Sequence, residues 1–77
     1  MHFADQNWMQ VEDYLKKDQR VMLVLGACEQ HGYLSLLTDV MVPEALARAA
    51  SETSGVMVAP SVNFGCSPYF LGYPGTI

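Results

Sequence analysis

The chain has 77 residues and a formal net charge of −4, with 51% hydrophobic and 16% charged residues. This apolar, sparsely charged composition is typical of a chain that folds around a core, and it excludes intrinsic disorder. The few basic residues form no extended patch, so nucleic acid is not expected as a partner. No apolar run reaches the roughly 20 residues that span a bilayer, so no membrane partner is expected.

The two cysteines, Cys28 and Cys66, do not resemble the dense disulfide framework of a small secreted domain. The start of the chain, MHFADQNW, lacks the basic and apolar regions of a signal peptide. Both features predict a reduced, cytoplasmic setting. A chain of this length forms one small domain that is only marginally stable unaided, so additional support is expected.

A helix and then a buried strand are predicted at the start of the chain. Apolar residues recur at helical spacing after Asn7, a favourable N-cap, and indicate a helix over about residues 7–18. The apolar run 21–25 follows and ends at Gly26. Because the polarity of this run does not alternate, it predicts a strand buried on both faces, as in a parallel sheet.

A second helix and a second strand are predicted next. Asp39 is expected to cap the helix, with Pro43 in the first turn, where a missing N–H costs no helical hydrogen bond. Gly55 marks the end of the helix, and the apolar run 56–60 follows it. The expected buried face of the helix consists of Val42, Leu46, Ala49, Ala50 and Thr53.

The order helix, strand, helix, strand, loop predicts an α/β fold with a mainly parallel sheet, because two parallel strands need a crossover connection. Residues 61–77 are rich in glycine, proline and aromatic residues, and a loop of this length is often functional. Two strands make a poor independent sheet. We therefore expect residues 1–77 to be a single, truncated domain.

The candidate chemistry lies between the first strand and the second helix. Glu29 and His31 follow the strand two residues apart, so an extended backbone directs both side chains the same way. Asp39 is expected at the same sheet edge, where ligands bind in open parallel sheets. Carboxylates and imidazole are the donors that Zn²⁺ and Mn²⁺ take in hydrolases. A two-metal site bridged by Asp39 would fit this set, although His31 as a backbone-bonded side chain and Asp39 as a simple helix cap fit the residues too.

The string GACEQHGYLSLLTD resembles the signature of the creatininase family, in which a strand leads into Gly-(Ser/Ala/Thr)-x-Glu-Gln-His-Gly and then a Thr-Asp pair. The later string FGCSPYFLGYPGTI is similar to the family's loop ending in Phe/Tyr-Pro-Gly-Thr. The resemblance covers nearly the whole chain and implies the N-terminal part of a three-layer α/β/α sandwich. It also implies that Glu29 binds one divalent ion, His31 the other, and Asp39 both.

The ions implied are Zn or Mn, with Fe as a further option, and the assembly implied is a homo-oligomer, a hexamer in the family. The family completes its site with a histidine and a glutamate from farther along. Two departures stand out: the connection from His31 to Asp39 is one residue shorter, and Phe70 stands where many relatives have histidine. They imply a divergent subgroup whose substrate differs from creatinine. Four residues are candidates for substrate binding: Tyr33, Ser67, Tyr69 and Tyr73.

The leading functional hypothesis is part of a hydrolase that cleaves the C–N bond of a small or cyclic amide with a water activated by two metal ions. No residue is assigned as a catalytic acid or base. One alternative is a non-catalytic binding or assembly protein, or an inactive fragment, that retains the fold. Another is a two-metal hydrolase of a formamide, a lactone or a peptide-like bond, which would use the same ligands.

Overall fold

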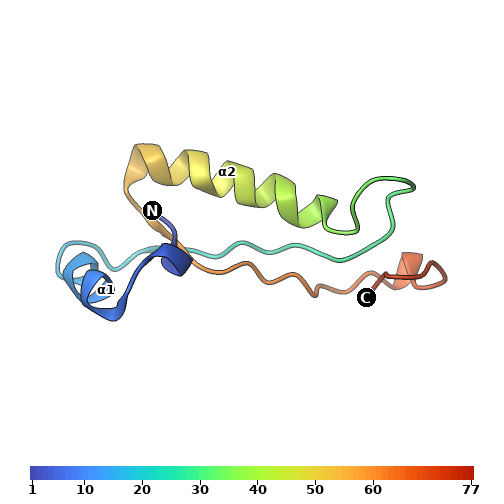
Figure 1. Ribbon diagram of the computed structural model, residues 1–77, viewed down its shortest axis with the longest axis horizontal. Helices are drawn as coiled ribbons and strands as arrows, with labels where there is room; N and C mark the ends of the chain where they lie inside the picture. Colours follow the sequence, from blue (N-terminus) through green and yellow to red (C-terminus); the bar gives the residue numbers. More distant parts are fainter.

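Two extended segments run side by side along the molecule, and one long helix lies over them (Figure 1). The computed structural model describes residues 1–77, with principal extents of 47 × 20 × 17 Å. Two short 3-10 turns accompany the helices and strands. In chain order the elements are η1 (Phe3–Asp5), α1 (Trp8–Leu15), β1 (Val21–Met22), α2 (Thr38–Ser54), β2 (Met57–Val58) and η2 (Pro68–Phe70).

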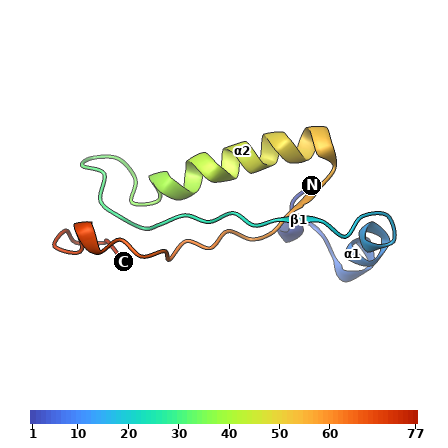
Figure 2. The ribbon, with the colours of Figure 1, turned by 180° about the vertical axis from the view of Figure 1, so that it is seen from behind.

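The two strands pair in parallel, with Val21 opposite Met57 and Met22 opposite Val58. The chain passes from β1 through α2 to β2, which is the crossover that a parallel pair requires (Figure 2). An isolated bridge between Leu25 and Val62 continues the pairing beyond the regular strands. The predicted α/β class and its order of elements are therefore confirmed.

The first helix begins where the sequence predicts. The side chain of Asn7 accepts a hydrogen bond from the Gln10 amide at 3.0 Å, and the Gln10 side chain accepts one from the Asn7 amide at 2.9 Å. This reciprocal capping box satisfies two amides that would otherwise lack partners. The helix ends earlier than predicted, at Leu15, and beyond it Asp18 accepts hydrogen bonds from the backbone and side chain of Arg20.

The expectation that the first strand is buried on both faces is wrong for this chain. Val24 is 4% exposed, whereas Leu23 and Leu25 are 70% and 66% exposed. Val24 and Gly26, which alternate with Leu23 and Leu25, face α2, since Gly26 closely approaches the first turn of that helix. One helix covers one face of the extended segments, so the continuous apolar run has a buried side and an open side.

The start of α2 also differs from the prediction. Leu37 occupies the N-cap position without a side-chain bond, Asp39 lies in the first turn, and Pro43 is inside the helix, in its second turn. Proline has no N–H, so the carbonyl of Asp39 receives no helical hydrogen bond. That carbonyl lies against Gly26 instead, where an added Cβ would come within 2.7 Å of it.

The predicted buried face of α2 is wrong as well. Val42 and Leu46 are 58% and 68% exposed, and the other three predicted positions are exposed too. The helix packs through a different stripe, which consists of buried Val40 and Ser51 and half-buried Pro43, Glu44 and Ala47. Polar residues are tolerated there because their partners lie on the strand side. The Ser51 hydroxyl donates to the Val56 carbonyl at 2.6 Å, and the Ser61 hydroxyl donates to Glu44.

The end of α2 and the second strand follow the prediction. Gly55 adopts a left-handed conformation with φ of 73°, and its amide donates to the Ser51 carbonyl. Val56, Met57 and Val58 are all buried and form half of the small apolar core. Beyond them the chain contains only η2 as regular structure. No helix of the structure has the length and apolar character that crossing a membrane requires.

Candidate metal centre

The three predicted ligands come together. One ligand atom each from Glu29, His31 and Asp39 can be chosen so that all lie within 4.8 Å of one another. Nε2 of His31 is 3.2 Å from Oδ2 of Asp39 and 3.6 Å from Oε1 of Glu29. The expected convergence of side chains from the strand end and the helix start is therefore present in the structure.

The ring nitrogen of His31 carries the strongest sign of a missing partner. Nε2 is buried and forms no hydrogen bond, although two carboxylates lie beside it. A buried polar atom without a partner is costly, and native structures rarely leave one. A divalent cation between the ring and the carboxylates would accept the lone pair of this nitrogen, so the residues present fit a metal ion.

The Asp39 carboxylate is prepared for a cation. The neighbouring Glu29 carboxyl group and, after it, the His31 ring hold the pKa of Asp39 below its ordinary value. Asp39 also lies in the first turn of α2, where the helix dipole favours negative charge. A carboxylate ligand must be deprotonated, and both effects favour the deprotonated form of Asp39.

Local backbone contacts fix the segment that carries Glu29 and His31. The Glu29 amide donates to the Leu36 carbonyl at 3.1 Å, and the Leu34 amide donates to the His31 carbonyl at 3.0 Å. Gly32 has a φ of 59°, a conformation that glycine adopts without strain. The turn after His31 and the contact with Leu36 return the chain toward α2, which carries Asp39.

None of the four predicted substrate-binding residues lines either pocket of the structure. Tyr33 and Tyr69 are fully or almost fully exposed, at 110% and 91%, and Tyr73 is also exposed. Ser67 is buried, and the ring of Tyr69 packs edge-on against Phe70 with centroids 5.4 Å apart. No shared cavity joins the four residues, and their roles stay predictions.

Two residues with notable polar atoms, of which only Thr76 bonds to the ligand segment, were not predicted as site residues. Thr76 accepts a hydrogen bond from the Gln30 amide, which lies between two of the ligands, at 2.9 Å. Asn63 follows Val62 in the extended segment and holds its Oδ1 atom buried without a partner. Thr76 belongs to the second string of the family resemblance, so a signal for it existed. No sequence pattern pointed to Asn63.

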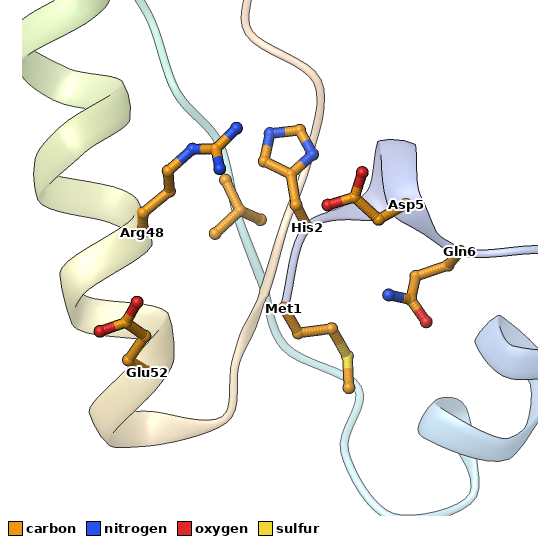
Figure 3. Close-up of a pocket in the computed structure, with 7 residues that line it drawn as sticks. Met1, His2, Asp5, Gln6, Arg48 and Glu52 are labelled. Atoms are coloured by element: carbon orange, nitrogen blue, oxygen red, sulfur yellow. The ribbon is translucent and has the colours of Figure 1, made fainter.

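A pocket of about 190 Å³ lies elsewhere, between α2 and the start of the chain. Arg48 and Glu52 reach it from α2, while His2 and Asp5 line it from the N-terminal segment (Figure 3). None of the three candidate ligands lines this pocket. The metal centre and the pocket are therefore separate features.

The sequence profile of a family described as creatininase, creatinine amidohydrolase, matches residues 4–77. The chain belongs to the creatininase family. This confirms the resemblance carried by the two strings.

A mycofactocin precursor peptide peptidase of Mycolicibacterium smegmatis is 38% identical over 64 residues, which are 74% of this chain and 26% of that protein. A creatinine amidohydrolase of Pseudomonas putida is 37% identical over 46 residues, 58% of this chain and 18% of that protein.

Solved creatininase structures share the fold. A structure described as creatininase Mn aligns with 99% of this chain and 32% of its own, with a TM-score of 0.89 and 29% identity. A mutant creatininase of Zn-Zn type aligns with a TM-score of 0.88, and a mutant complexed with creatine with 0.89. The chain thus spans about a third or less of the length of the relatives it matches.

Proposed function

We propose that Glu29, His31 and Asp39 are ligands of a two-metal centre in a hydrolase that cleaves the C–N bond of an amide. The observation that carries the proposal is the unpartnered Nε2 of His31, which is buried between the two carboxylates. Membership of the creatininase family and the Mn and Zn-Zn forms of related structures support divalent ions as the cofactors.

Each of the three side chains has a distinct part in this proposal. Asp39 would hold both ions, as the family resemblance implies, and its carboxylate lies at the helix start within 4.8 Å of a ligand atom of each other residue. Glu29 binds one ion and His31 the other, as the family resemblance implies. Three side chains cannot complete the coordination of two ions, so additional donor groups are required.

When bound, two such ions would supply an activated water and would polarise the scissile carbonyl. The chain's own contribution is to hold the ligands ionised and oriented. Glu29 and Asp39 supply negative charge that offsets the charge of the cations, and the lowered pKa of Asp39 keeps its carboxylate available. The buried position of His31 Nε2 reserves its lone pair for a ligand bond.

The substrate class follows from the relatives. One matched protein is named for a precursor peptide and another for creatinine, and both names describe cleavage at amide bonds. We infer a small or cyclic amide as the substrate, with a peptide-like amide as the second candidate. The peptidase favours that second candidate, since it matches a larger share of this chain. A cytoplasmic homo-oligomer, hexameric as in the family, remains part of the proposal.

Metal analysis tests the proposal directly. The protein, at the length that its gene encodes, is purified from metal-supplemented cells and analysed by mass spectrometry for bound Zn, Mn and Fe. We expect stoichiometric metal in the wild type and loss of both ions in Asp39→Ala. Asp13→Ala is the matched control, because Asp13 is exposed and pairs only with Lys16. A wild-type protein without stoichiometric metal would refute the proposal.

A further inference from the structure

The segment that bears the ligands is held on one side by residues far away in the sequence. The Gln30 amide donates to Oγ1 of Thr76 at 2.9 Å, and the Ile77 amide donates to the Cys28 carbonyl at 2.8 Å. The buried thiol of Cys28 donates to the Gly75 carbonyl at 3.3 Å. Three hydrogen bonds thus join residues 75–77 to residues 28–30, which include the ligand Glu29.

This arrangement resembles one rung of a parallel ladder with a single change. In a parallel pair, the amide of one residue donates to a carbonyl of the neighbouring strand. The carbonyl of the same residue accepts from the amide two residues farther along that strand. Ile77 donates to Cys28 in this way, but the Gln30 amide is received by the Thr76 hydroxyl. The Thr76 hydroxyl therefore takes the acceptor role that a backbone carbonyl has in a regular parallel pair.

The Gln30 amide has a special place, because its residue separates Glu29 from His31. A rotation of the peptide there would turn the two ligand side chains relative to each other. The bond to Thr76 is partly buried, so water replaces it poorly if the hydroxyl is removed.

We infer that Thr76 is a positioning residue, whose hydroxyl fixes the peptide between Glu29 and His31 and thereby sets the geometry of the metal centre. Thr76 acts through the Gln30 amide and not as a metal ligand. The expected effect on metal binding rests on the proposed function. The effect on the Gln30 peptide rests on the hydrogen bond alone.

Two measurements test the inference separately. Zn²⁺ affinity is determined by competition with a chelating indicator, using the protein at the length that its gene encodes. Amide hydrogen exchange at Gln30 is measured in the metal-free protein. The variants are Thr76→Val, which keeps the shape and loses the oxygen, Thr76→Ala as a smaller replacement, and Thr76→Ser, which keeps the oxygen. Thr53→Val is the matched control, since its exposed hydroxyl bonds only within α2.

Loss of a group that orients a metal ligand typically weakens metal binding about 10–100-fold. We expect this loss in Thr76→Val and Thr76→Ala, together with faster exchange at Gln30, while Thr76→Ser and Thr53→Val behave like the wild type. Unchanged exchange and affinity in Thr76→Val would overturn the inference, and so would an equal loss in Thr76→Ser. A wild type that binds no Zn²⁺ would overturn the proposed function, and the exchange measurement would still decide the role of Thr76.

Discussion

The two extended segments are joined both at the Leu25–Val62 bridge and near the ligands, but by different means. At the bridge, the Val62 amide donates to the Val24 carbonyl and the Gly26 amide donates to the Val62 carbonyl, both at 2.9 Å. Near the ligands, one of the two corresponding bonds ends on the Thr76 hydroxyl. The bridge depends on backbone atoms that every residue has, whereas the ligand end depends on a particular side chain.

The same contrast extends to packing. Around β2, stability comes from buried apolar residues, of which Val58 is 1% exposed. Around the ligands, Cys28 and Val40 are the buried apolar residues, and individual hydrogen bonds and one close approach at Gly26 hold the chain. We therefore expect substitutions at the two ends to have different signatures: loss of global stability at β2, and loss of metal binding at the ligand end.

The largest effect is expected from Gly26→Ala. A Cβ at this position would come within 2.7 Å of the Asp39 carbonyl and of a methyl group of Val40, and the carbonyl is part of the helix backbone. Overpacking of this kind costs about 1–3 kcal/mol. Because the first turn of α2 must move away, the metal content should fall together with the free energy of unfolding.

Gly72→Ala is the control for that variant, because a Cβ there would meet nothing within 4 Å. Urea unfolding and metal analysis of both variants provide the comparison. If Gly26→Ala kept full metal content and stability, the close approach between Gly26 and α2 would have no part in placing Asp39.

A similar loss of stability, but without a loss of metal binding, is expected from Val58→Ala. Full burial of a valine side chain contributes about 1.5–3 kcal/mol, and most of this is lost on truncation. Zn²⁺ affinity of the folded fraction should stay at the wild-type value, because Val58 belongs to the other end of the molecule. Val62→Ala is the control, since Val62 is 51% exposed. A loss of Zn²⁺ affinity equal to that of Gly26→Ala would remove the distinction between the two ends.

The features that the sequence predicted well are those with local causes. Asn7 caps its helix through a residue three positions away, and Gly55 ends α2 through its own left-handed conformation. The convergence of Glu29, His31 and Asp39 was also predictable, because all three belong to one strand-to-helix connection. Their role as metal ligands stays a prediction until metal is measured.

The features that the sequence did not predict depend on distant partners. The packed stripe of α2 includes Ser51 and Glu44, whose partners Val56 and Ser61 flank β2, so apolar periodicity favoured the wrong face. The contact between Gln30 and Thr76 spans 46 residues. Pro43 lies in the second turn and leaves the Asp39 carbonyl without a helical partner, and Gly26 leaves room for that carbonyl. No local sequence pattern predicts this contact.

The smallest effect is expected from Arg20→Gln, which changes a contact with Asp18 just before β1. Hydrogen bonds from the Arg20 side chain and then from its backbone amide lower the pKa of Asp18 from 3.8 to about 2. A lowered pKa means that the contact stabilises the fold above the pKa of the unfolded chain, and that this contribution is lost as the pH falls from about 4 through about 2. In Arg20→Gln, NMR titration should show the Asp18 pKa rising toward its ordinary value, with metal binding unchanged. An Asp18 pKa that stays near 2 in this variant would show that groups other than the Arg20 side chain lower it.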